Sequence, residues 1–303
     1  MDLRERAVGS VLGLALGDAL GAPFEFRRAH EIPDPVPAFE LPWNGLPPGT
    51  TTDDTAMARN LVRSLIELER FDADDVLHRH LEWLASDPPD AGNLTRRVLT
   101  RTREGAPAAA REYVEQRGPE VSAGNGSVMY CAPLGVAYAR RSHELLVLAP
   151  ALSAITHWDE RCRTACLAVT LAIAALIRGE AADRAVASAV SATVDREGGE
   201  ELEYLVEAAG RARPVDGPDR GFALFTAGLA LQTAAAARSF ERGLRYVVSL
   251  GGDTDTNAAV AGALLGALHG RPGLPASWLG RLRDREAIER EAEGLAALAE
   301  RIS

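Results

Sequence analysis

Two short segments rich in aspartate and threonine lie about 200 positions apart in this chain of 303 residues. The first acidic segment is 51–55 (TTDDT) and the second is 251–256 (GGDTDT), and neither contains Lys or Arg. Neighbouring carboxylates repel each other, so the pKa of one rises unless a cation lies nearby. Carboxylate and hydroxyl oxygens are the ligands that Mg²⁺ and Mn²⁺ prefer. If the fold joins the two segments, up to four carboxylates meet, which is enough for two metal ions.

Helix capping is an alternative role for these side chains. An amphipathic helix is expected directly after Asp53 and Asp54, and a small-residue helix around Asp255 and Thr256. Because Asp and Thr are favoured at helix N-termini, we expect one of the first pair to cap its helix, and one of the second pair could do the same. Capping alone does not explain why the chain carries two such segments.

Apolar residues recur at helical spacing through most of the chain, and no stretch sustains the alternation of a β-strand. The expected helices include 161–178, 180–194, 199–211, 218–237, 255–269 and 283–302. A proline-rich loop at about 27–50 interrupts the pattern, and loops of this length are usually functional or mobile. No repeat or linker divides the chain. The sequence therefore predicts an all-α, single-domain, many-helix orthogonal bundle over residues 1–303.

Glycines recur every four residues on two of the expected helices. They are Gly9, Gly13, Gly17 and Gly21 on the first, and Gly262, Gly266 and Gly270 on the helix after the second acidic segment. Each interior helical glycine costs about 1 kcal/mol relative to alanine. Close approach of two backbones would offset this cost, so we expect both faces to pack deep in the core and to bring the acidic segments together. The alternative is ordinary small-residue packing with no connection to a site.

Composition restricts the class of protein. The formal net charge of −10 argues against a nucleic-acid backbone as a general partner, although bound divalent cations would still permit an anionic substrate. Three cysteines without a disulfide framework suit a reducing compartment. The charged N-terminus has no signal-peptide pattern, and the longest apolar run, about 165–177, is too short to cross a membrane. We expect a cytoplasmic protein with no membrane partner.

Four motifs occur in order along the chain. They are 17–25 (GDALGAPFE), 51–57 (TTDDTAM), 124–129 (GNGSVM) and 251–256 (GGDTDT), the last followed by an Ala/Gly-rich helix. In this order and at these separations, from about residue 5 to 270, the chain resembles the ADP-ribosylglycohydrolase family. The resemblance implies an all-helical fold of the ADP-ribosylglycohydrolase type, with a binuclear Mg²⁺ or Mn²⁺ centre in a cleft.

Carried over by position, the resemblance also implies a ligand set. One metal ion would be held by Thr52, Asp53, Asp54 and Asp255, and the second by Asp253, Asp255 and Thr256, with Asp255 bridging both. Asp18 lies near the glycine-rich face of its helix, where a carboxylate needs a partner. We interpret Asp18 as a support for the metal ligands, against the alternative of a capping or surface role.

The proton-transfer residue is expected to be Glu25 or Asp54. Glu25 ends the first motif and enters the proline-rich loop, and the resemblance implies a movable glutamate near the metals. A mobile segment can bring such a carboxylate into a cleft together with substrate. The alternative is a solvated loop glutamate. No residue is an obvious nucleophile with an adjacent base, which favours direct attack by water.

The resemblance places the pyrophosphate of ADP-ribose at a small-residue loop that we expect to precede a helix, since backbone N–H groups there bind anions. Its candidate contacts are Ser122, Gly124, Asn125, Gly126 and Ser127, with His157 and Asp159 nearby. An ordinary turn and a structural histidine are the alternatives. Many family members have Arg where this chain has Tyr130, which leaves the effect on substrate contacts open.

The implied reaction is hydrolysis of the N- or O-glycosidic bond between the distal ribose of ADP-ribose and an acceptor. The partner would be ADP-ribose, an ADP-ribosylated protein or a small conjugate, with nucleic acid entering only as an ADP-ribosylated end. The acceptor (arginine, serine, acetyl or nucleic acid) stays open, as do the choice between Mg²⁺ and Mn²⁺ and the oligomeric state. The rival functions are a non-catalytic ADP-ribose-binding protein and a metal-dependent nucleotide phosphohydrolase.

Overall fold

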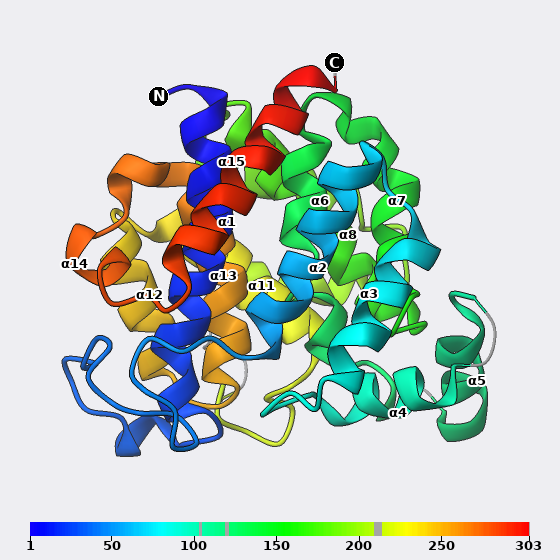
Figure 1. Ribbon diagram of the computed structural model, residues 1–303, viewed down its shortest axis with the longest axis horizontal. Coiled ribbons are helices and arrows are strands. Elements are labelled where there is room, and N and C mark those ends of the chain that lie inside the picture. Colours follow the sequence, from blue (N-terminus) through cyan, green and yellow to red (C-terminus); the bar gives the residue numbers. More distant parts are fainter. Residues whose placement is uncertain (103–104, 119–120, 209–213, 303) are drawn as a thin grey trace.

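The computed structural model describes residues 1–102, 105–118, 121–208 and 214–302, and over these residues the regular secondary structure is helical, with isolated β-bridges and no strand (Figure 1). The α-helices are α1 (Leu3–Gly21), α2 (Asp53–Leu68), α3 (Ala73–Ala85), α4 (Asn93–Arg101), α5 (Ala108–Arg117), α6 (Ala132–Ala137), α7 (Leu145–Ser153), α8 (Glu160–Ile177), α9 (Ala182–Ser191), α10 (Gly199–Ala208), α11 (Ala223–Ala236), α12 (Phe240–Ser249), α13 (Thr254–His269), α14 (Ala276–Leu279) and α15 (Arg285–Arg301). The all-helical prediction is confirmed.

Most expected helices lie close to their predicted bounds. The exception is α11, which begins at Ala223 rather than near 218, because Pro218 and Gly221 belong to a loop that enters the candidate site. The last residues expected in α10, 209–211, lie outside the described residues.

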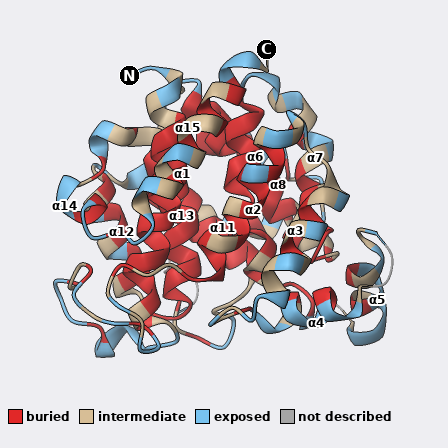
Figure 2. Cartoon of the chain, viewed as in Figure 1, coloured by how far each residue is buried: buried red, intermediate tan, exposed pale blue. Residues whose placement is uncertain are grey.

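Helices α1 and α13 run antiparallel through the centre of the molecule, side by side in Figure 1. Every residue of α1 from Ala7 onward is buried, and Figure 2 shows α1, α8, α11 and α13 as the buried centre. The stretch Leu3–Phe24 is long and apolar enough to cross a membrane by length and composition, but 94% of its apolar window is buried inside the structure. Its apolar surface is therefore covered by the chain's own helices.

The glycine faces of α1 and α13 meet as the sequence predicts. A Cβ added at Gly9, Gly13, Gly17 or Gly21 would fall within 3.0 Å of a backbone carbonyl oxygen of α13. Those carbonyls belong to Gly266, Gly262, Ala258 and Thr254, in that order. Gly270 differs, since it lies beyond the end of α13 at φ +64°, a conformation that favours glycine on its own account. The C-terminal end of α1 and the N-terminal end of α13 therefore lie together.

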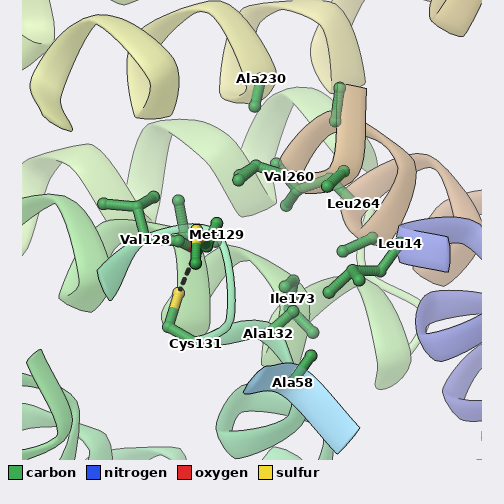
Figure 3. Close-up of a cluster of buried hydrophobic side chains, with 14 of the residues drawn as sticks. Leu14, Ala58, Val128, Met129, Cys131, Ala132, Ile173, Ala230, Val260 and Leu264 are labelled. Atoms are coloured by element: carbon green, nitrogen blue, oxygen red, sulfur yellow. Dashed lines mark hydrogen bonds between the residues drawn. The ribbon is translucent and has the colours of Figure 1, made fainter. Parts of the chain in front are cut away.

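Side chains from distant segments fill the space around this helix pair. Figure 3 shows Leu14 of α1, Ala58 of α2, Ile173 of α8, Ala230 of α11 and Val260 of α13 in one cluster of buried apolar side chains. The three cysteines are free and buried.

The proline-rich loop is irregular, as expected, but it is anchored to the fold. Its side chains Ile32, Val36, Phe39 and Trp43 are buried, and the Phe39 ring lies 5.5 Å from the ring of Trp278. The backbone oxygen of Gly49 accepts a hydrogen bond of 2.9 Å from the N–H of Arg283.

We expect Gly13→Ala to lower the free energy of unfolding by about 3 kcal/mol or more, since the added methyl overlaps a backbone that cannot move aside. Gly280→Ala is the matched control, because a Cβ there meets no atom closer than 3.5 Å and the expected change is within about 0.5 kcal/mol. Denaturant unfolding followed by circular dichroism measures both. Equal stability of the two variants would contradict the packing argument.

Candidate metal centre and active site

The junction of α1 and α13 brings three carboxylates together. One oxygen each of Glu25, Asp253 and Asp255 lies within 4.8 Å of the others. The chain after α1 is tied to the second acidic segment by its backbone, since Phe26 N–H donates to Gly252 O at 2.7 Å and Gly252 N–H donates to Arg27 O at 2.9 Å. Glu25, expected only as a proton-transfer residue, therefore also belongs to the group that could hold a cation.

The first acidic segment starts α2 without using its aspartates as caps. Thr52 is the N-cap, and its hydroxyl accepts the N–H of Asp54 at 3.3 Å. The carboxylate of Asp18 accepts the backbone N–H of Thr52 at 3.0 Å, the N–H of Thr55 at 3.1 Å and the hydroxyl of Thr55 at 2.5 Å. The prediction that Asp53 or Asp54 caps this helix is wrong, because Thr52 and Asp18 already satisfy the free N–H groups.

Of the two aspartates that begin α2, Asp54 contacts the second acidic segment and Asp53 contacts the segment before α4. Asp54 Oδ2 accepts hydrogen bonds from Thr52 Oγ1 at 3.2 Å and from Thr256 Oγ1 at 3.4 Å. Asp53 Oδ2 accepts the N–H of Gly92 at 2.9 Å. The two acidic segments thus meet, as the sequence predicts.

The second acidic segment does not cap α13 either. Asp253 occupies the N-cap position but makes no capping hydrogen bond, and its Oδ2 accepts from the side chain of Asn125 at 2.9 Å. The hydroxyl of Thr254 donates to Gly21 O at 2.8 Å, which ties the two helix ends together. Asp255 Oδ1 accepts the N–H of the adjacent Thr256 at 2.9 Å.

This cluster is electrostatically strained without a cation. Burial, reinforced by neighbouring aspartates, raises the pKa of Asp54 and of Asp255 well above the ordinary value. The same causes raise the pKa of Glu25 to about 8 and that of Asp53 to about 7. Burial also raises the pKa of Asp18 to about 6 against the opposing effect of its hydrogen bonds. Ionised carboxylates at this density need compensating positive charge.

The donors fit a hard divalent cation. Asp54 Oδ1 is buried and has no hydrogen-bond partner, which is costly for a carboxylate oxygen. The surrounding groups are carboxylates and threonine hydroxyls. The three side chains that converge most closely, Glu25, Asp253 and Asp255, all offer carboxylate oxygens. An oxygen-only donor set of this kind suits Mg²⁺ or Mn²⁺ rather than a thiophilic metal.

A cavity of about 380 Å³ opens onto these groups. Its lining includes Glu25, Asp53, Asp253, Asp255 and Thr256 from the acidic group, together with Gly124, Asn125, Gly126 and His157. Thr52, Asp54 and Asp18 are buried and do not line it. The cavity is large enough for part of a nucleotide-sized ligand.

The small-residue loop divides into residues that reach the cavity and residues that brace it. Ser122 Oγ donates to Asp159 Oδ2 at 2.7 Å, and Ser127 Oγ is 2.9 Å from Ser153 Oγ, so neither seryl hydroxyl lines the cavity. The expected helix directly after the loop is wrong, because a 3₁₀ turn at Asn125–Ser127 follows and α6 begins only at Ala132. The loop therefore presents no helix N-terminus, and the N–H groups of Asn125 are already engaged: its backbone N–H donates to Gly221 O and its side-chain amide to Thr226 and Asp253.

His157 and Asp159 have different surroundings. Burial lowers the pKa of His157 to about 4, so its ring, which lines the cavity, is neutral near pH 7. Asp159 caps α8 and pairs with Arg161 at 2.8 Å; burial would raise its pKa, but the hydrogen bonds from Arg161 and Ser122 outweigh that effect and lower it. Tyr130 is buried, with its hydroxyl 3.0 Å from Thr156 Oγ1, and does not line the cavity.

Several lining residues were not expected from the sequence, and three of them carry side chains that could contact a ligand. Asp90 precedes α4 and is half-buried, Phe26 follows Glu25, and Arg220 lies in the loop before α11. Burial and the nearby Asp253 raise the pKa of Asp90, despite the opposing effects of a backbone hydrogen bond and Arg96. No motif marks these positions, although Asp90 follows two prolines in a loop, where functional side chains often occur.

We expect Asp255→Asn to fold while losing Mg²⁺ affinity at least about tenfold, because one charged ligand oxygen is removed from a crowded anionic site. Without Mg²⁺ its melting temperature should equal or exceed that of the wild type. Calorimetric titration and thermal unfolding measure the two quantities. Asp183→Asn, an exposed change of the same charge on α9, is the control; equal Mg²⁺ affinity of all three proteins would contradict the assignment.

The pH dependence of stability follows from the raised pKa values of Glu25 (about 8) and Asp53 (about 7). A group that binds its proton more tightly when folded stabilises the fold fully below its unfolded pKa, and this contribution is lost as pH rises through the folded pKa. Without divalent cations, the melting temperature should therefore fall between about pH 5 and pH 8. Mg²⁺ should reverse that fall, since it binds the ionised form. A cation-free melting temperature that rises across this range would refute the argument.

Comparison with known proteins gives the family. The family model for ADP-ribosylglycohydrolase matches residues 1–303. The ADP-ribosyl-[dinitrogen reductase] glycohydrolase of Rhodospirillum rubrum is 32% identical over 98% of this chain and 97% of its own length. The ADP-ribosylarginine hydrolase Tri1 of Serratia proteamaculans is 27% identical over 97% of this chain and 80% of its own.

Structural comparison agrees. A solved ADP-ribosylglycohydrolase-related protein complex contains a chain that superimposes with a TM-score of 0.82, at 34% identity, over 98% of this chain and 99% of that one. The fold is therefore of the ADP-ribosylglycohydrolase type, as the motifs imply. The chain belongs to the ADP-ribosylglycohydrolase family, whose members cleave ADP-ribose linkages.

Proposed function

We propose that this protein hydrolyses the glycosidic bond between the distal ribose of ADP-ribose and an acceptor, using two divalent cations, Mg²⁺ or Mn²⁺. The observation that carries the proposal is the convergence of Glu25, Asp253 and Asp255 within 4.8 Å, at a cavity that Asp53 also lines. We further propose that residues 1–303 act as one catalytic domain in the cytoplasm.

The proposed ligands are those that the motifs imply. Thr52, Asp53, Asp54 and Asp255 would hold one ion, and Asp253, Asp255 and Thr256 the other. The hydrogen bond from Thr256 to Asp54 supports this set, because it joins the two groups of ligands. When bound, such cations lower the pKa of a coordinated water and orient sugar hydroxyls. Asp18 positions Thr52 and Thr55, and so fixes the start of α2.

Glu25 is the proposed proton-transfer residue. It lines the cavity, whereas Asp54 is fully enclosed and accepts hydrogen bonds from two threonines. Burial, reinforced by the surrounding carboxylates, raises the pKa of Glu25 to about 8, and positive charge in the site would favour release of its proton. A carboxylate poised in this way can take a proton from the attacking water or return it to the leaving group.

The remaining lining suggests how ADP-ribose lies. The loop 124–126 lines the same cavity as the carboxylates, and we place the pyrophosphate beside the backbone N–H groups of Gly124 and Gly126. A second cavity of about 420 Å³ begins on the other side of Gly124 and Gly221, lined by Phe222 with the Arg161 guanidinium 5.6 Å from its ring centre. We place the adenosine there, because a planar base stacks well on an aromatic ring and a guanidinium.

Asp90 favours a cationic acceptor. Its carboxylate lines the same cavity as Glu25 and Asp53. A guanidinium is recognised by a carboxylate through paired hydrogen bonds. A relative named as an ADP-ribosylarginine hydrolase agrees with this choice. We therefore propose ADP-ribosylated arginine as the preferred substrate, ahead of serine, acetyl or nucleic-acid conjugates.

The experiment is a panel of arginine- and serine-linked ADP-ribosyl peptides, assayed for free ADP-ribose with Mg²⁺, with Mn²⁺ and with a chelator. We expect turnover of the arginine conjugate that the chelator abolishes. Glu25→Gln should lower kcat by about 10²- to 10⁴-fold, while Asp90→Asn should raise KM for the arginine conjugate more than for the serine conjugate.

Asp183→Asn serves again as the control and should match the wild type. Binding of ADP-ribose without any turnover would instead identify a non-catalytic ADP-ribose-binding protein. Release of inorganic phosphate from a nucleotide, without free ADP-ribose, would identify a phosphohydrolase.

A further inference from the structure

The charged side chains around the cavity of about 380 Å³ are nearly all acidic. Its described lining contains five carboxylates, from Glu25, Asp53, Asp90, Asp253 and Asp255. Arg220 is the one Lys or Arg among the described lining residues, and His157 is neutral near pH 7 because burial lowers its pKa. An anionic ligand that enters this cavity therefore meets a single fixed positive charge.

The Arg220 side chain lies over an aromatic ring at the cavity. Its guanidinium lies 5.1 Å from the centre of the Phe26 ring, and within the described residues it forms no ion pair with a carboxylate. The Phe26 side chain is 56% exposed, so the stacked pair sits at the solvent edge of the cavity. A guanidinium stacked on an exposed ring keeps its N–H groups free for a new acceptor.

The backbone on both sides of this pair is fixed. Asp216 Oδ2 accepts the N–H of Ala29 at 3.0 Å, and Asp216 O accepts from the Arg28 guanidinium at 3.0 Å. A Cβ added at Gly252 would lie 3.3 Å from Arg220 Cβ, so the base of the Arg220 side chain is in contact distance of the second acidic segment. Arg220 is therefore anchored at its base, while its head group can turn from Phe26 into the cavity.

We propose that Arg220 is a specificity-determining residue that binds the diphosphate of the substrate, leaving Phe26 when the ligand enters. This inference rests on the proposed function, since it takes a nucleoside diphosphate sugar as the ligand. Gly221, next in sequence, lines both cavities, so Arg220 stands beside the boundary at which a diphosphate would join ribose to adenosine. A planar guanidinium suits two phosphate oxygens, and its charge offsets the repulsion between phosphate and the carboxylates.

The test is calorimetric binding of ADP-ribose, ADP and adenosine in the presence of Mg²⁺, to wild type, Arg220→Gln and Arg220→Lys. We expect Arg220→Gln to weaken ADP-ribose and ADP about 10- to 100-fold, the range for loss of a hydrogen-bonded charge. Adenosine should bind equally to all three proteins. Arg220→Lys should recover part of the loss, because it keeps the charge without the planar fork.

Ionic strength supplies a readout that a structural role would not move. The affinity for ADP-ribose should fall less steeply with added salt in Arg220→Gln than in the wild type, because one charge pair is gone. Arg242→Gln on α12, an exposed change of the same charge at a different cavity, is the matched control and should leave the slope unchanged. Phe26→Leu separates the two residues: it should keep the wild-type salt slope and bind ADP-ribose within about threefold of the wild type.

Several outcomes would overturn the proposal. Wild-type affinity in Arg220→Gln would do so, as would equal losses in Arg220→Gln and Phe26→Leu with unchanged salt slopes, which would mean that Arg220 only holds Phe26 in place. In both cases ADP-ribose still binds the wild type, so the proposed function stands. Failure of the wild type to bind ADP-ribose would instead remove the proposed function, and this inference with it.

Discussion

Direct contact between the backbones of α1 and α13 is the constraint on which the site depends. Interior glycines cost helical stability, and the contact offsets that cost by letting the two helices approach without intervening side chains. The antiparallel arrangement then fixes which ends meet. Gly21 lies against Thr254, so the residues just after α1 are neighbours of those that begin α13. Glu25 and Asp253 lie close together because the two helix ends are in contact.

The same contact brings together charges that repel. Hydrogen bonds inside the cluster involve threonine hydroxyls, backbone N–H groups and Asn125, and none of these supplies a full positive charge. The raised pKa values of Glu25, Asp53, Asp54 and Asp255 express the resulting cost. Burying these carboxylates lowers the stability of the fold unless a cation is bound. Clusters with strongly raised pKa values are typical of functional sites, so this one indicates a functional site. If the proposed function holds, stability and catalysis depend on the same carboxylates.

Much of this arrangement could be predicted from the sequence. The two glycine faces and the two acidic segments are local patterns with a clear physical reading, and both the α1–α13 packing and the meeting of Asp54 with Thr256 follow from them. Local reasoning failed where several groups compete for one role. Asp53 and Asp54 are good caps by residue type, but Thr52 and the distant Asp18 already satisfy the N–H groups of α2. Ser122 and Ser127 are good anion ligands by type, but Asp159 and Ser153 engage them. Asp90 and Arg220 carry no motif, and only the folded chain shows that they face the cavity.

The central claim is that carboxylates from two segments about 200 residues apart, 51–55 and 251–256, share divalent cations. A crystal structure of the protein grown with Mn²⁺, with anomalous scattering recorded at the manganese edge, measures this directly. The account predicts anomalous peaks among Asp53, Asp54, Asp253 and Asp255, with Asp255 contacting both ions. Well-ordered acidic side chains with no anomalous density between the two segments, at Mn²⁺ concentrations in the millimolar range, would contradict it.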